Sequence, residues 1–243
     1  MEVVVISIDE ESRIIDDMMD RIVKRKLSPG EKLPSENELA DEYRVPRMTV
    51  RNALTKFEER GYIYSKQGKG RYVKEASIPI QLSLTGRISF TDKMNQMGYD
   101  LMTSNIYCEK MDYEMEVYQK LNADEHDSVY RIGRLRYING EPIAIHNSYV
   151  NESSFPEIKE DGPEIESMFA YYRKQGFSDF TSRKTMLSIT FPTSKEQQLL
   201  SCKSMVPLIK VESDCIDIES KQVLEHTKIL YRSDKFKYDI TMD

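Results

Sequence analysis

The sequence has no run of apolar residues that approaches the roughly 20 needed to cross a bilayer. It is also poor in metal-ligating and disulfide-forming residues, because it has three histidines and three widely spaced cysteines, Cys108, Cys202 and Cys215. This spacing predicts neither a disulfide framework nor a zinc site, so we expect no metal and no cofactor. The first residues, MEVVVISIDEESRI, lack the basic segment and small-residue cleavage site of a secretory signal. We therefore expect a protein of the reducing cytoplasm, with no membrane partner.

The composition is that of a globular protein whose charge is unevenly distributed. The 243 residues are 39% apolar and 31% charged, so the chain can bury one large core or two modest ones. Residues 24–74 hold thirteen Lys and Arg against seven Asp and Glu, a local charge of +6. Since the net charge of the chain is −6, the remainder carries −12. A basic module beside an acidic remainder predicts a polyanionic partner.

The sequence pattern in and just before the basic region predicts three helices. Apolar residues recur at helical spacing over residues 12–26 and predict the first helix. Ser35 and Glu38 form a capping box that begins a short second helix. A third helix is predicted over residues 46–60, with Gly61 placed to end it.

A β-hairpin is predicted directly after the third helix. Short strands at residues 62–65 and 71–73 flank the turn Gln67-Gly68-Lys69-Gly70. Three helices followed by a hairpin are the order of a winged helix-turn-helix. The glycines of the turn permit close approach to a DNA groove. Three basic residues of the hairpin supply charge for phosphates: Lys66, Lys69 and Arg71.

The third helix presents polar residues opposite a buried stripe. Val50, Ala53, Leu54 and Phe57 fall on one helix face, which turns five other side chains outward: Arg47, Thr49, Arg51, Asn52 and Lys56. In a helix-turn-helix, this helix enters the major groove, where Arg reads guanine and Asn can read adenine. Two other interpretations are a merely solvated charged face and a nucleotide-phosphate loop at GKG. The second lacks the Walker spacing and context.

The stretch LSPGEKLPSENELADEYRVPRMTVRNAL, followed by GYIYSKQGKGRYV, resembles the GntR family of bacterial transcription regulators. The resemblance implies that Arg47 and Arg51 contact an operator, that Thr49 contacts a phosphate, and that Gly68 reaches into the minor groove. Family members commonly carry Arg where this chain has Asn37, and Ser or Thr where it has Pro46. Asn37 remains a candidate DNA contact, and we expect an operator that differs from the common family site.

The remaining chain predicts an α+β domain on an antiparallel sheet, because strands and helices mix without regular βα alternation. We place a DNA-binding domain at residues 1–75, a linker at 76–82 and the second domain at 83–243. Strands are predicted at residues 129–138, 142–150, 208–218 and 222–231. Helices are predicted at residues 90–97, 164–175 and 194–200, the last with Ser194 and Gln197 as its capping pair.

A hairpin in this domain brings two arginines to one face. Arg134 and Arg136 are two residues apart in a strand, so their side chains point the same way. A three-residue loop, residues 139–141, keeps the apolar residues together and places His146 opposite Arg134. From the residues alone, the two arginines are either ion-paired surface residues or a cradle for a phosphate or carboxylate. Helix N-termini near Thr91 and Ser167 would add N–H donors.

The runs SFTDKMNQMGY, RLRYINGEPIAIHNSYV, FPEI and SMFAYYRKQGF look like the UTRA ligand-binding domain of the HutC subfamily, over residues 83–236. The resemblance implies a sugar-phosphate pocket with an anion cradle of Thr91, Arg134, Arg136 and Ser167. It also implies that three further residues line the pocket: His146, Glu225 and Tyr231. His146 stands where the subfamily usually has Glu. Glu225 and Tyr231 share one strand face with Thr227 and Ile229, which fits a pocket wall.

Together these patterns predict a homodimeric transcription regulator, a repressor, that binds palindromic operator DNA and is released by a small anionic effector such as a sugar phosphate. Two alternatives remain open at this point. The UTRA fold resembles chorismate lyase, so an enzyme is conceivable, although no nucleophile–base pair or paired carboxylates stand at a telling spacing. The other is a DNA-binding protein without an effector.

Overall fold

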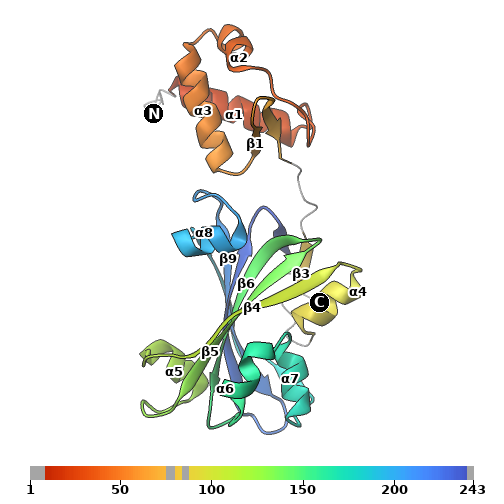
Figure 1. Ribbon diagram of the computed structural model, residues 1–243, viewed down its shortest axis with the longest axis vertical. Helices are drawn as coiled ribbons and strands as arrows, with labels where there is room; N and C mark the ends of the chain where they lie inside the picture. Colours follow the sequence, from red (N-terminus) through yellow and green to blue (C-terminus); the bar gives the residue numbers. More distant parts are fainter. Residues whose placement is uncertain (1–8, 75–79, 84–87, 240–243) are drawn as a thin grey trace, which may run out of the picture. The chain divides into compact units, whose positions relative to one another are not determined.

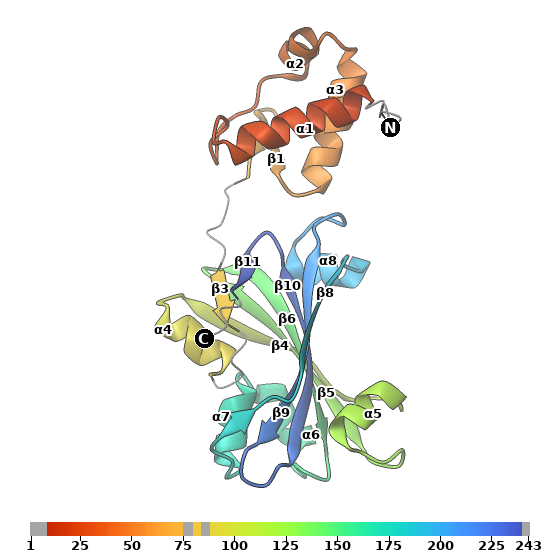
Figure 2. The ribbon, with the colours of Figure 1, turned by 180° about the vertical axis from the view of Figure 1, so that it is seen from behind.

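The structure is a computed structural model that describes residues 9–74, 80–83 and 88–239 (Figures 1 and 2). The chain divides into two compact units, an N-terminal one that includes residues 9–74 and a C-terminal one that begins before residue 80. No helix within the described ranges is long and apolar enough to cross a membrane.

The N-terminal unit is a winged helix-turn-helix, as the sequence predicts. Its elements are α1 (Glu10–Val23), α2 (Glu36–Tyr43), α3 (Arg47–Glu59), β1 (Ile63–Lys66) and β2 (Gly70–Val73). The predicted stripe of α3 is buried, and it packs in one core with Ile14 and Met18 of α1 and Leu39 of α2. This packing fixes which side chains of α3 are left to face outward.

Local signals set the helix ends in this unit. The capping box of α2 forms as predicted: the Ser35 hydroxyl accepts from the Glu38 N–H at 3.2 Å, and the Ser35 N–H donates to Glu38 at 2.7 Å. α3 ends at Glu59 with Arg60 as its C-cap, and the following Gly61 adopts a φ of +79°. The Tyr62 N–H then bonds the Phe57 carbonyl, which closes the helix end as the predicted C′ glycine requires.

The wing is a two-stranded antiparallel hairpin in which Lys66 pairs with Gly70. Gly68 and Gly70 have positive φ angles of +70° and +106°, which a branched residue would adopt only with strain. The tip is exposed from Ser65 to Gly70. The wing therefore presents its backbone at the surface.

The C-terminal unit is built on a seven-stranded sheet within the described residues, in the order β4-β5-β6-β10-β9-β7 with β8 also paired to β9. All these pairs are antiparallel, so the predicted fold class is confirmed. The strands are β4 (Leu101–Lys110), β5 (Val129–Ile138), β6 (Glu141–Asn151), β7 (Phe180–Thr181), β8 (Thr185–Thr190), β9 (Leu208–Asp217) and β10 (Val223–Arg232). A separate parallel pair joins β3 (Ile80–Ser83) to β11 (Phe236–Asp239). Residues 80–82 of the predicted linker thus lie in β3, and residues 76–79 lie outside the described residues.

Helices cover both faces of the sheet. They are α4 (Phe90–Gln96), α5 (Met115–Leu121), α6 (Ile158–Asp161), the 3₁₀ turn η1 (Gly162–Glu164), α7 (Met168–Lys174) and α8 (Ser194–Leu200). Figures 1 and 2 show α4 and α7 on one side of the sheet and α5 on the other. α6 and α7 pack on Tyr130 and Ile132 of β5. Since strand residues alternate, Arg134 and Arg136 point to that same side.

One predicted helix start and one predicted helix cap are wrong. The predicted helix over 164–175 begins only at Met168, because Gly162 and Pro163 form a 3₁₀ turn and Ile165 is extended. The helix after residue 193 begins as predicted, but its cap is Thr193 with Glu196 rather than Ser194 with Gln197. In both cases the actual cap is one of several neighbouring residues with suitable chemistry.

The hairpin of β5 and β6 corrects the predicted loop while keeping its register. Asn139 and Gly140 form a two-residue turn, with φ angles of +51° and +76°, rather than a three-residue loop. A bulge follows, so that Tyr137 pairs with Pro142 but Arg136 pairs with Ala144. The extra residue restores the predicted register, and Arg134 lies opposite His146.

Candidate DNA-binding face and effector pocket

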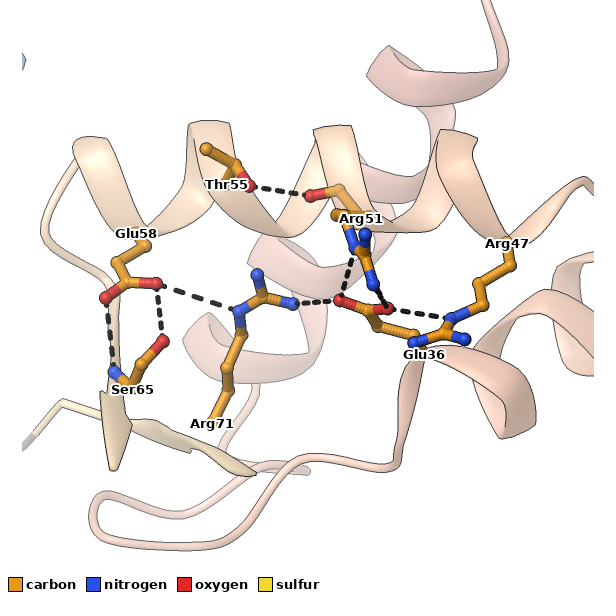
Figure 3. A network of polar contacts seen from close by, with 7 residues as sticks. All are labelled: Glu36, Arg47, Arg51, Thr55, Glu58, Ser65 and Arg71. Atoms are coloured by element: carbon orange, nitrogen blue, oxygen red, sulfur yellow. Dashed lines mark hydrogen bonds and ion pairs between the residues drawn. The ribbon is translucent and has the colours of Figure 1, made fainter. Parts of the chain in front are cut away.

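The outward side of α3 carries exposed basic side chains. Arg47 and Arg51 have side chains that are 56% and 45% exposed, and both approach the carboxylate of Glu36 on α2 (Figure 3). The Arg47 Nε donates to Glu36 at 2.9 Å, and the Arg51 Nη2 donates to it at 3.0 Å. Sequence reasoning placed these arginines correctly on the surface but assigned Glu36 no role.

The other polar residues of α3 are placed differently. Asn52 donates to Glu11 of α1 at 3.0 Å, and Lys56 pairs with the same carboxylate. Thr49 is half-buried. Met48 is 56% exposed in the first turn of α3, a position that the sequence analysis did not consider because it followed only polar residues.

A groove runs between α2, α3 and the wing. Six of the predicted DNA contacts line it: Asn37, Arg47, Arg51, Lys66, Gly68 and Arg71. Lys69 lies at the exposed tip, outside the groove. The Lys66 ammonium lies over the rings of Tyr64 and Tyr72, with its nitrogen 4.5 Å from the centroid of Tyr72. The groove and tip together form a basic surface that suits a polyanion.

The C-terminal unit contains a cavity of about 180 Å³ between α4, α7 and the sheet. All seven predicted effector residues line this cavity: Thr91, Arg134, Arg136, His146, Ser167, Glu225 and Tyr231. Thr227 and Ile229 lie on the same wall as Glu225 and Tyr231, as their strand alternation predicts. Residues from five separate elements thus converge on one space.

The two arginines are buried rather than ion-paired on the surface, with 3% and 2% exposure for Arg134 and Arg136. Arg134 donates to the hydroxyl of Ser148, and Arg136 to that of Thr103. Burial lowers the pKa of Arg134, and the charge of Glu225 opposes this shift. Burial and the charge of Arg134 lower the pKa of Arg136 to about 9. These directions mark a site with more buried positive charge than its surroundings neutralise.

His146 is a neutral polar group in an aromatic setting. It is 4% exposed, and its ring lies 4.8 Å from Phe90 and 5.5 Å from Tyr231, measured between centroids. Burial, followed by the charges of Arg136 and Arg134, lowers the pKa of His146 well below its usual value. Its imidazole therefore offers one donor and one acceptor without a charge.

Glu225 is one of two carboxylates that line the cavity, and the other, Asp214, is paired with Arg183. The Oε2 of Glu225 accepts from the Tyr172 hydroxyl at 3.1 Å. Burial raises the pKa of Glu225, and the charge of Arg134 acts in the opposite direction. Because Asp214 is already paired with Arg183, Glu225 is left to face the two buried arginines, and the site keeps an excess of positive charge.

Four residues that line the cavity each have a buried polar atom with no hydrogen-bond partner among the described residues: Thr91 Oγ1, Arg134 Nε, Arg136 Nε and His146 Nε2. Buried polar groups in proteins nearly always find partners, and an unpaired one costs about 1–3 kcal/mol. Three of these four groups can donate to an anion. This set is the clearest feature of a binding site in the unit.

Ser148, Thr103 and Phe90 also belong to the site, although the sequence analysis missed them. Ser148 is two residues beyond His146, so strand alternation alone places it on the same face. Phe90 and Thr103 come from other elements, α4 and β4, and no local spacing joins them to Arg136. No group of three or more His, Cys, Asp or Glu in the described ranges could hold a metal ion.

A winged helix-turn-helix with a basic outer face, joined to a domain with a buried cationic cavity, defines a ligand-responsive DNA-binding regulator. Residues 10–73 match the bacterial regulatory proteins of the gntR family, and residues 96–237 match the UTRA domain. The chain belongs to the GntR family of bacterial regulatory proteins and carries a UTRA domain. It is a transcription regulator and not an enzyme, which removes the lyase-like alternative.

Several known proteins of similar sequence are repressors. The chain is 26% identical over 231 residues to the HTH-type transcriptional repressor NagR of Bacillus subtilis. The matched region covers 95% of this chain and 93% of that protein. It is 25% identical over 229 residues to the mannosyl-D-glycerate transport/metabolism system repressor MngR of Escherichia coli, covering 94% and 93%. The fold is similar to the crystal structure of PhnF from Mycobacterium smegmatis, with a TM-score of 0.62 and 20% identity over 94% of this chain and 99% of that one.

Proposed function

We propose that this regulator is a cytoplasmic, homodimeric repressor that binds a palindromic operator and is released by a small anionic metabolite such as a sugar phosphate. The single observation that carries the effector part is the set of unpartnered polar atoms around the cavity of the C-terminal unit. The operator part rests on the exposed arginines of α3 and the glycine-containing wing.

Symmetry supports the dimer. One recognition helix touches only a few base pairs, so a helix-turn-helix protein gains a longer site by pairing two heads over a two-fold axis. The Arg47 side chain is exposed near the start of α3, where the motif places residues that meet base edges. Operator DNA in a bacterium lies in the cytoplasm, which supports that location.

The cavity favours an anionic group at one end. Arg134 and Arg136 each have an unpartnered Nε, and the Thr91 hydroxyl is also unpartnered. A phosphate or carboxylate can accept from these donors, and such charge-assisted bonds are worth about 1.5–3 kcal/mol each. An anion would also relieve the repulsion between the two buried guanidinium groups.

The rest of the cavity favours a polar body of small size. His146 and Glu225 supply a neutral imidazole and a carboxylate, which suit the hydroxyl groups of a carbohydrate. Tyr231, Ile229 and Val211 provide an apolar wall. The name of the similar repressor MngR refers to mannosyl-D-glycerate, a sugar that bears a carboxylate, which is consistent with an anionic carbohydrate.

A comparison of matched ligands tests the proposal. Thermal unfolding and calorimetry are measured with hexose phosphates, with the corresponding free hexoses, and with inorganic phosphate. We expect one phosphorylated or carboxylated sugar to raise the melting temperature and to release DNA, whereas its uncharged counterpart does neither. If no anionic carbohydrate or related metabolite binds and operator binding is constitutive, the protein is an effector-independent repressor instead.

A further inference from the structure

Glu36 is the meeting point of three arginines from two elements. It is the first residue of α2, directly after the N-cap Ser35, and its side chain is only 17% exposed. Arg47 and Arg51 reach it from α3, and Arg71 reaches it from β2 of the wing with an Nη1–Oε1 distance of 3.0 Å (Figure 3). The arginines outnumber the carboxylate, so this cluster keeps a net positive charge.

The contact of Arg47 leaves its reading end free. Only Nε of Arg47 bonds Glu36, and its two terminal nitrogens have no polar contact within the described part of the chain. Those two nitrogens form the fork that pairs with O6 and N7 of guanine. Arg51 is held along its side, through Nε at 3.2 Å and Nη2 at 3.0 Å. The Glu36 carboxylate thus accepts hydrogen bonds from Nε of both guanidinium groups and from Nη2 of Arg51.

A second carboxylate ties the wing to the same helix. Glu58 of α3 accepts from the N–H and the hydroxyl of Ser65 at 3.2 and 2.7 Å. It also lies 3.7 Å from Nε of Arg71, the same arginine that bonds Glu36 (Figure 3). With only 20% of its side chain exposed, Arg71 serves as a bridge between two carboxylates. Helix and wing are therefore linked through one polar network.

We infer that Glu36 is a positioning residue for operator readout: its carboxylate orients Arg47 and Arg51 so that their free nitrogens face the bases. The inference rests on the proposed operator contact of α3. Its physical basis is conformational entropy, because a flexible arginine side chain loses rotamer freedom when it binds. A side chain already held in one orientation loses less of this freedom when it meets DNA.

The same carboxylate also repels DNA phosphates, and this separates positioning from simple electrostatics. The three arginine contacts hold the pKa of Glu36 at about 2, so it is ionised at any working pH. Removing its charge should favour binding to any polyanion. Removing its hydrogen bonds to Arg47 and Arg51 should weaken only the base contacts that depend on the orientation of these arginines. On random DNA, only the loss of repulsion acts, so affinity should stay equal or rise. On cognate DNA, the loss of arginine orientation should outweigh it, so affinity should fall.

The test compares Glu36→Gln with Asp41→Asn, which removes the same charge from the same helix. Asp41 is exposed and makes no polar contact among the described residues. The cognate probe is the palindromic duplex that the wild-type protein selects from a random library, and the reference is unselected duplex. We expect Glu36→Gln to weaken cognate binding about 5- to 10-fold while leaving affinity for random duplex equal or higher. Asp41→Asn should not weaken either.

Two further variants make the outcome decisive. Glu36→Asp keeps the charge but withdraws the carboxylate by one methylene, and it should also lose discrimination. In an Arg47→Ala, Arg51→Ala background, Glu36→Gln should no longer weaken cognate binding, because only the loss of its negative charge remains. If Glu36→Gln instead strengthens binding to both duplexes equally, Glu36 competes with DNA for the arginines and the inference is wrong. If the wild type selects no sequence at all, the proposed operator function fails rather than this assignment.

Discussion

Arg134 and His146 lie directly opposite each other on β5 and β6, and both are buried against one cavity. A permanent cation thus stands beside an imidazole in a site with little solvent. The arrangement keeps the histidine neutral, since burial and the charges of Arg136 and Arg134 all lower its pKa. It also gives the folded protein a definite response to acid.

Acid should destabilise this protein through His146. The unfolded chain takes up a proton as the pH falls through about 6.5, whereas folded His146 does not, so the free energy of unfolding falls with pH. Between pH 7.5 and 5.5, one such histidine accounts for a loss of about 1.4 kcal/mol. His146→Gln should remove this part of the pH dependence, as measured by denaturant unfolding at several pH values.

His126 is the matched control, because its side chain is 91% exposed. His126→Gln should leave the pH dependence as it is in the wild type. His226, whose pKa is also lowered by burial, should retain its own share in both variants. A slope in His146→Gln identical to that of the wild type would show that folded His146 takes up its proton over the same pH range as the unfolded chain.

The strand register around Arg134 could be predicted from the sequence, but the bulge that produces this register could not. Apolar alternation required Leu135 and Ile145 to share a face, and the structure meets that requirement. The asparagine and glycine at 139 and 140 favour a two-residue turn, which alone would give the wrong register. The bulge near Arg136 allows the two-residue turn and the apolar register to occur together, and no local sequence pattern predicts this bulge.

The role of Glu36 shows a second limit of sequence reasoning. The capping box drew attention to Ser35 and Glu38, whose interaction is local, three residues apart. Glu36 acts through Arg51 and Arg71, which are 15 and 35 residues away. Such contacts depend on how α2, α3 and the wing pack, and a spacing rule within one helix does not reach them.

Base readout by Arg47 predicts a sequence-dependent loss. Arg47→Ala should cost about 1–3 kcal/mol on the selected palindrome and much less on random duplex, because its bidentate base contact is lost. Arg60→Ala removes the same charge from an exposed position just past the end of α3. Fluorescence anisotropy of both variants on both duplexes separates the effects. Equal losses for Arg47→Ala on the two duplexes would assign Arg47 to a phosphate.

The wing predicts a steric effect at Gly68. A Cβ at this position meets no atom within 4 Å, but the φ of +70° strains most side chains. Asn tolerates that conformation, so Gly68→Asn should fold with nearly the wild-type melting temperature. We expect it to weaken DNA binding, because the added side chain blocks close approach to the groove. Normal binding by Gly68→Asn would place the wing tip away from DNA.

Lys69 predicts a different signature, since its charge at the exposed tip suits a phosphate. Lys69→Ala should weaken binding to all duplexes alike and reduce the slope of log affinity against log salt by about one. Titrations at several salt concentrations measure this slope. A sequence-dependent loss with an unchanged slope would point to a base contact instead.

The most direct measurement of the central claim is effector binding and DNA release by an Arg134→Met, Arg136→Met variant, which keeps an unbranched apolar stem at both positions but removes both cations. Arg131→Met is the control, because Arg131 lies on the same strand but pairs with Glu109 on the opposite face. We expect the double variant to bind operator with wild-type affinity and to bind the effector at least 10- to 100-fold more weakly. It should also stay on DNA at effector concentrations that release both the wild type and Arg131→Met. Unchanged effector affinity in the double variant, by calorimetry, would contradict the account and place the effector outside this cavity.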